Sequence, residues 1–280
     1  LNLEGEGVFK VTGSAADLFT AGAVAVKAAK SSRFELPEGT TLSVRSILVD
    51  GVLPIVAGTY DASTCMLISG GGALVVAETA SDGGDATIWT GAQGTAWENA
   101  ANWTDGLPSA TVRGVVSDGS VDQPILADGT AAGTIGNVVF SRIAGTAVTV
   151  DVKTAADFSG GDFKIGSGAT VKVASNGTFT WNAASRGVNY QTETSSIDAG
   201  GALESAGTID LNMTGQLAVR GLLSLSGGHM TVENNNGYAQ LMVKNGGRLE
   251  ASGNTVVDVK QTGGLDAEEG GSIAFSDDAV

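Results

Sequence analysis

Short stretches of alternating apolar and polar residues recur at a nearly constant spacing in the second half of the chain. The later stretches open 8 residues apart, at Leu241, Leu249, Val257, Leu265 and Ile273. The earlier ones are separated by steps of 8, 6 and 7 residues and open at Ile209, Leu217, Leu223 and Met230. Period-two alternation is typical of β-strands with one buried face. A fixed spacing of such strands restricts the fold to a solenoid, a sandwich or a barrel, and three strands per turn give a rung of roughly 24 residues.

One longer step of 11 residues interrupts this spacing between Met230 and Leu241. It contains the run Asn234–Gly237. Because the run breaks the period, we expect it to form a protruding loop rather than an amide ladder.

Pairs of glycines separate many of these strands. They stand at Gly200-Gly201, Gly227-Gly228, Gly246-Gly247, Gly263-Gly264 and Gly270-Gly271. Two glycines can form a tight hairpin, which would indicate an antiparallel sandwich. They can also form the corners of a β-helix, where the backbone needs positive φ. Since the step is fixed and cross-strand charge pairs are lacking, we predict an all-β fold, a parallel β-helix expected to be right-handed, with the sandwich as the alternative.

Residues 1–79 show the same alternation in shorter pieces. Examples are Val8–Val11, Phe34–Leu36, Leu42–Val44 and Leu74–Val76. The segment Ala21–Ala29 has helix propensity, yet Val24, Val26 and Ala28 alternate with Ala25 and Lys27, which favours a strand. The polar, glycine-containing stretch Ser81–Asp85 then indicates a boundary.

The charge and amino-acid composition of the chain exclude several classes of binding partner. The net charge is −15, with 15 Lys and Arg residues scattered singly, which argues against nucleic acid and against insertion into or binding to an anionic membrane. The apolar run Ala21–Val26 is too short to cross a bilayer, and no charged-then-apolar leader opens the chain at Leu1, so we expect a mature segment or a fragment. Cys65 is the single cysteine; it can form no internal disulfide and is expected to be a small buried hydrophobic residue.

Two segments resemble parts of a known family. Val49–Gly51, Ala57–Tyr60 and Ile68–Val76 resemble the closing rungs of autotransporter-type passenger repeats in secreted bacterial proteins. Trp89–Gly91, Trp97, Asn102-Trp103 and Pro108 look like the tryptophan module that opens a following β-helix in such proteins. The resemblance implies a secreted, repetitive β-helix exposed at the cell surface, and it implies no activity. We therefore expect terminal rungs of one block at 1–80, a Trp-rich junction at 81–125 and a second block at 126–280.

Three of the four tryptophans lie close together in the expected junction. Trp89, Trp97 and Trp103 follow one another at intervals of 8 and 6 residues. They can close into one apolar cluster that seals the end of a solenoid, with each indole N–H bonded to a carbonyl. The alternative is a platform on which sugars stack. We favour the seal, because aromatic side chains contribute the largest buried area per residue.

Acidic residues near the junction are candidate calcium ligands. Asp118, Asp122 and Asp128 lie in a glycine-containing region, and Asp82 and Asp85 precede it. Their spacing matches neither a calcium hand nor a glycine-aspartate nonapeptide repeat, and aspartate is a common turn residue. The sequence therefore predicts no cofactor and leaves calcium as a weak alternative.

A catalytic centre on a β-helix would need a carboxylate cluster or a basic residue facing an acidic sugar. Glu193, Asp198, Glu204 and Arg186 are candidates, but each also fits a solvated strand edge. No catalytic motif accompanies them, and we expect the protein not to be an enzyme.

Three functions remain in order of preference. The first is an extracellular stalk, filament or matrix component, in which β-helical blocks adjoin in tandem or copies stack end to end, because both ends lack a polar cap. The second is an adhesin or glycan-binding surface module. The third is a polysaccharide-active enzyme.

Overall fold

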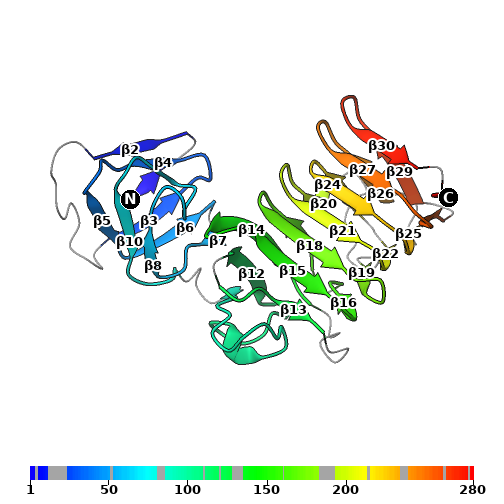
Figure 1. Cartoon of the computed structure of the whole chain (residues 1–280), viewed down its shortest axis with the longest axis horizontal. Coiled ribbons are helices and arrows are strands. Elements are labelled where there is room, and N and C mark those ends of the chain that lie inside the picture. Colours follow the sequence, from blue (N-terminus) through cyan, green and yellow to red (C-terminus); the bar gives the residue numbers. More distant parts are fainter. Residues whose placement is uncertain are drawn as a thin grey trace.

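The computed structural model describes residues 1–3, 6–11, 24–50, 53–80, 86–109, 111–119, 121–127, 135–159, 161–182, 193–212, 215–233, 239–260, 263–276 and 278–280. Regular structure in these residues is β, apart from the short 3-10 helix η1 (Ala100–Asn102). Figure 1 shows a long stack of strands, coloured from green to red, beside a smaller blue block. We call the stack, residues 86–280, the solenoid, and residues 1–80 the N-terminal block.

The solenoid consists of three parallel sheets with eight, seven and five strands. The eight-stranded sheet contains β11 (Ala86–Ile88), β12 (Arg113–Asp118), β14 (Val138–Ala144), β17 (Phe163–Ile165), β20 (Glu193–Ile197), β23 (Gln216–Val219), β26 (Ala239–Val243) and β29 (Gly263–Ala267). The seven-stranded sheet contains β13 (Ile125–Leu126), β15 (Val148–Val152), β18 (Ala169–Val173), β21 (Ala202–Ser205), β24 (Leu222–Leu225), β27 (Arg248–Ala251) and β30 (Ser272–Phe275). The five-stranded sheet contains β16 (Ala155–Asp157), β19 (Thr178–Asn182), β22 (Thr208–Asn212), β25 (His229–Glu233) and β28 (Val256–Val259).

From β14 onward the chain visits the three sheets in turn, so each sheet takes every third strand. All the neighbouring strands in these sheets pair in parallel. Gln216, Gln240 and Gly264 stand in register, 24 residues apart each time. The predicted parallel β-helix and its rung length are therefore confirmed, and the antiparallel sandwich is wrong. The expected Asn234–Gly237 loop lies outside the described residues.

The core of the solenoid is formed by the inward residues of the alternating strands. Ile209, Leu217, Leu223, Met230, Leu241 and Leu249 are all fully buried, as the alternation predicts. Aromatic rings form a continuous column through this core, in the order Trp97, Phe140, Phe158, Phe179, Phe163 and Trp181, with neighbouring centroids 4.8–6.2 Å apart. Such edge-to-face and tilted contacts add to the stability that burial gives.

Glycines form the predicted corners at four of the five pairs. Gly200 has φ of 78°, a conformation in which a Cβ is strained, and a Cβ at Gly247 would collide with the carbonyl oxygen of Val219 one rung below. The prediction is wrong for Gly263-Gly264, because both residues open strand β29. A glycine pair can therefore mark a strand as well as a corner where the backbone of the preceding rung approaches closely, since a Cβ at Gly263 would lie 2.6 Å from the carbonyl oxygen of Val232.

The N-terminal block is a shorter coil of three small sheets. They contain β1 (Asn2–Leu3), β3 (Ala25–Ala28), β6 (Ser46–Val49) and β7 (Leu53–Pro54); β2 (Val8–Lys10), β4 (Arg33–Glu35) and β9 (Ile68–Ser69); and β5 (Thr41–Val44), β10 (Ala73–Val76) and β8 (Gly58–Tyr60). Most pairs are parallel, but β6–β7 and β10–β8 are antiparallel. Strand β3 confirms the strand prediction for 25–28, while residues 21–23 lie outside the described part.

Replacing Ile209 by Asp tests the inward register. The charge would lie in the apolar interior of β22, and we expect the free energy of unfolding to fall by about 4 kcal/mol or more. Thr208→Asp, on the partly exposed face of the same strand, should cost less than about 1 kcal/mol. Urea unfolding of the two variants measures the difference, and equal stability would contradict the register.

Candidate functional site

The structure brings the three tryptophans of the junction into one cluster at the first rungs of the solenoid. The ring of Trp103 meets those of Trp97 and Trp89 edge-on, with centroids 4.7 and 5.2 Å away. Trp89 and Trp97 are stacked at 6.3 Å. Trp97 also contacts Phe140, so the cluster continues directly into the aromatic column of the core.

The indoles are buried and two of their N–H groups are bonded to carbonyls. Trp89, Trp97 and Trp103 are 1, 3 and 4% exposed. Trp89 Nε1 donates to the carbonyl of Asp122 at 2.6 Å, and Trp103 Nε1 donates to that of Trp97 at 2.9 Å. A sugar platform needs a ring face open to solvent, and these rings offer none. Their geometry is that of a packed core.

Polar residues hold the segment around the tryptophans in place. Asn102 is fully buried; its Oδ1 accepts from Gln93 N at 2.6 Å and its Nδ2 donates to Ala96 O at 3.0 Å. The side chain of Asn99 caps η1 by accepting from Ala101 N. These bonds fix the loop so that it folds back over the first rung, where a backbone bridge joins Trp89 to Trp103.

The candidate calcium ligands do not converge. Asp118 ends β12 and is buried, whereas Asp122 is exposed and uses its backbone carbonyl for Trp89. Asp82, Asp85 and Asp128 lie outside the described residues. Within the described part of the chain, no three His, Cys, Asp or Glu residues are grouped as metal ligands.

The carboxylates that are candidates for catalysis lie on two sheets: Glu193 and Asp198 stand at the two ends of β20, both near Arg220, and Glu204 lies on β21. Glu193 forms a bidentate ion pair with Arg220 of the next rung. Asp198 Oδ2 lies 3.1 Å from Lys164 Nζ of the previous rung, and Glu204 stands beside Lys172 in the register. Arg186 lies outside the described residues. Glu193 and Asp198 therefore form ion pairs between neighbouring rungs.

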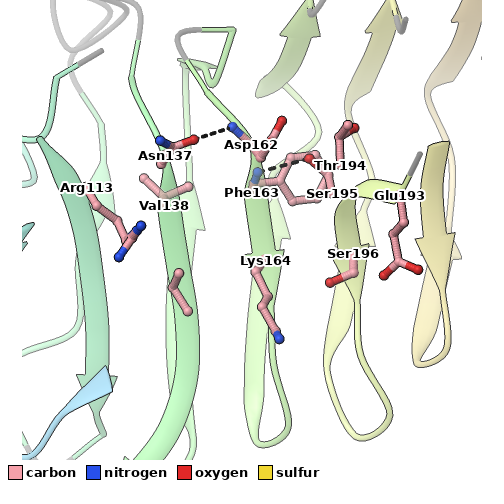
Figure 2. A pocket seen from close by; sticks show the side chains of 11 residues that line it. Arg113, Asn137, Val138, Asp162, Phe163, Lys164, Glu193, Thr194, Ser195 and Ser196 are labelled. Atoms are coloured by element: carbon pink, nitrogen blue, oxygen red, sulfur yellow. Dashed lines mark hydrogen bonds between the residues drawn. The ribbon is translucent and has the colours of Figure 1, made fainter. Parts of the chain in front are cut away.

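A groove that the sequence did not indicate lies on the outer face of the eight-stranded sheet (Figure 2). It has a volume of about 370 Å³ and crosses the first residues of β12, β14, β17 and β20, with Arg113, Asp162, Lys164 and Glu193 among its lining residues. It opens where β20 carries a register shift between Glu193 and Ser195. Here Phe163 N donates to Ser195 Oγ at 3.0 Å instead of to a strand carbonyl.

One polar atom of this groove lacks a partner. The hydroxyl oxygen of Thr194 is buried and makes no hydrogen bond to any of the described residues. An unsatisfied buried hydroxyl costs free energy, so it marks a position where a water molecule could bond. The side chain of Asn137 accepts from Asp162 N at 2.8 Å and shapes the neighbouring wall (Figure 2).

No family model, no curated protein and no solved structure matches the chain. No helix among the described residues is long and apolar enough to span a membrane.

Replacing Trp103 tests the packing role of the cluster. Trp103→Ala removes a buried ring and should lower the free energy of unfolding by about 3 kcal/mol or more. Trp103→Phe keeps most of the apolar contact but leaves the carbonyl of Trp97 without its donor, so a smaller loss, about 1–3 kcal/mol, is expected. Urea unfolding compares the two, and a near-neutral Trp103→Ala would contradict the role.

Proposed function

We propose that the protein is a structural segment of an extracellular rod, a stalk, filament or matrix component, and that its end rungs accept a further β-rung. The observation that carries the proposal is the distribution of exposed apolar side chains. Seven large apolar side chains are exposed in the described residues. Six of them lie on the first rung of the N-terminal block or on the last rung of the solenoid: Leu1, Val8, Val256, Val259, Phe275 and Val280. Leu107 is the seventh.

The last rung supports this proposal in detail. Leu249 is fully buried, whereas Ile273, its register neighbour on the next rung, is only partly buried and Phe275 is 47% exposed. Strands β28, β29 and β30 each end a sheet. The C-terminal residues cover part of β28, because Val257 N donates to Val280 O at 2.7 Å, whereas β29 and β30 pair with a strand on one side only among the described residues. Unpaired edges over an exposed core favour the addition of another strand layer.

The charge on the last rung favours stacking of copies head to tail over stacking in which the last rungs of two copies face each other. The last rung carries Asp266, Glu268, Glu269 and Asp278. Two such surfaces repel one another. The described residues of the first rung of the N-terminal block carry one acidic side chain, Glu6, and one basic side chain, Lys10, which is paired with Glu35, so this surface repels the last rung less. A heterologous contact of this kind does not close and therefore propagates as a filament.

The sides of the solenoid suit a rod because charges there are paired between rungs. Lys164–Asp198, Arg220–Glu193, Lys244–Glu268 and Lys260–Glu233 each join neighbouring rungs. Exposed pairs of this kind contribute little singly, but each one links a rung to its neighbour along the flank. The net charge of −15 and the resemblance to autotransporter-type passengers support a secreted, surface-exposed bacterial protein.

Light scattering and negative-stain microscopy of the 280-residue chain test this function. We expect the mean mass to rise with concentration and rods to lengthen. Phe275→Asp should abolish the rise, because it places a charge on the contact surface. Leu107→Asp, at the exposed apolar residue outside the end rungs, should leave it unchanged. A monomer at every concentration, or the same response from both variants, would contradict the proposal.

A second candidate is a glycan-binding module, favoured by the unpartnered hydroxyl of Thr194 in the outer groove. Neutral sugars present hydroxyls that would bond to it once a small shift of the strand end opens this buried oxygen to the groove. Thr194→Val should then weaken glycan binding about five- to tenfold, the worth of one hydrogen bond. Thr170→Val, on the outward face of β18, is the matched control. Glycan-array binding that is absent, or equal in the two variants, would exclude this role for the groove.

A further inference from the structure

The N-terminal block rests on the outer face of the first rungs of the solenoid, a contact that we call the seam. Strand β12 is buried on both faces: Val116 points into the solenoid core, while Val115 belongs to the apolar cluster of the N-terminal block. Val139 and Ile143 of β14 join the same cluster. The outer face of these strands is thus covered by protein rather than by solvent.

At least four hydrogen bonds between described residues cross the seam. Ser117 Oγ donates to Pro54 O at 3.0 Å, and Gly145 N donates to Thr64 O at 2.6 Å. The other two are Met66 N to Ile143 O at 3.4 Å and Lys30 Nζ to Ser141 Oγ at 2.9 Å. No β-ladder among the described residues joins the two blocks, because each sheet lies wholly within one of them.

Neighbouring rungs, by contrast, are joined by continuous ladders in three sheets, with five register pairs between β19 and β22 alone. Each block also has its own apolar cluster, and that of the N-terminal block extends onto the solenoid through Ala86, Ile88, Val115, Val139 and Ile143. Contacts between such units resemble transient protein interfaces, and cooperative units open separately when few bonds join them.

We propose that the N-terminal block is a releasable arm, which undocks from the solenoid as a unit while the rungs of the solenoid stay intact. Release exposes the apolar outer face of β12 and β14. Release of the arm depends only on the packing at the seam, so it is expected whether or not the protein serves as a rod.

Cys65 reports on the seam. It is fully buried in the cluster that the two blocks share, and burial raises the pKa of its thiol to about 11. The docked thiol is therefore shielded and protonated at neutral pH. Undocking gives it access to solvent and returns its pKa towards the ordinary value, so its reaction with a disulfide reagent accelerates.

The tryptophans report on the solenoid independently. The chain has four, Trp89, Trp97, Trp103 and Trp181, and all four belong to the solenoid core. In urea we expect Cys65 to react with the aromatic disulfide DTNB at concentrations where tryptophan emission is still native. If labelling and emission change together, the arm does not release separately and the proposal is overturned.

A matched pair of variants localises the effect. Val115 and Met242 stand on one outward row of the same sheet, through the register Val115, Val139, Lys164, Ser196, Ala218 and Met242. Val115→Asp should raise the labelling rate of Cys65 by at least about 30-fold with native tryptophan emission. Met242→Asp, outside the seam, should leave the rate unchanged. Equal rates in both variants would overturn the proposal, and the urea comparison on the wild-type chain tests it even if Val115→Asp fails to fold.

Discussion

Backbone hydrogen bonds between parallel strands of neighbouring rungs are the interaction on which the rest of the structure depends. A single rung of about 24 residues cannot satisfy its own peptide groups, since its donors and acceptors point along the axis to the rungs on either side. The inward residues must then stack directly on one another, which produces the aromatic column. The corners must also repeat at the same place in each rung, which is why glycines with positive φ recur there.

This dependence on neighbours makes the two ends of the solenoid different. At the first rungs the tryptophan cluster lies against the core, with Asn102 and the short helix η1 fixing the segment that carries it. At the last rung large apolar residues are exposed, and the edges of β29 and β30 are unpaired among the described residues, while Val280 covers part of the edge of β28. The tryptophan cluster therefore covers the core of the solenoid where the stack of rungs begins. At the last rung, the proposed contact with another rung would cover the core instead.

The repeat could be predicted from the sequence because period and alternation are local properties of the strands. The spacing of Leu241, Leu249 and Val257 gave the rung length, and the buried residues among them were found correctly except where the last rung lacks a neighbour. The seam could not be predicted from alternation, because it depends on which outer face another block covers. A signal was nevertheless present: Val115-Val116 and Val138–Phe140 are unbroken apolar runs, typical of strands buried on both faces. The groove depends on a register shift at Glu193, and no local pattern reveals such a shift.

Hydrogen exchange of the backbone amides along the stack tests most directly whether stability comes from neighbouring rungs. The account predicts the slowest exchange in the central strands β21 to β25, which have a rung on each side, and progressively faster exchange towards β28, β29 and β30. The amides of Trp97 and Trp103, which donate to the carbonyls of Ile125 and Ala100, should be protected as well. Equal protection of the central and last rungs, or rapid exchange throughout the central strands, would contradict the account.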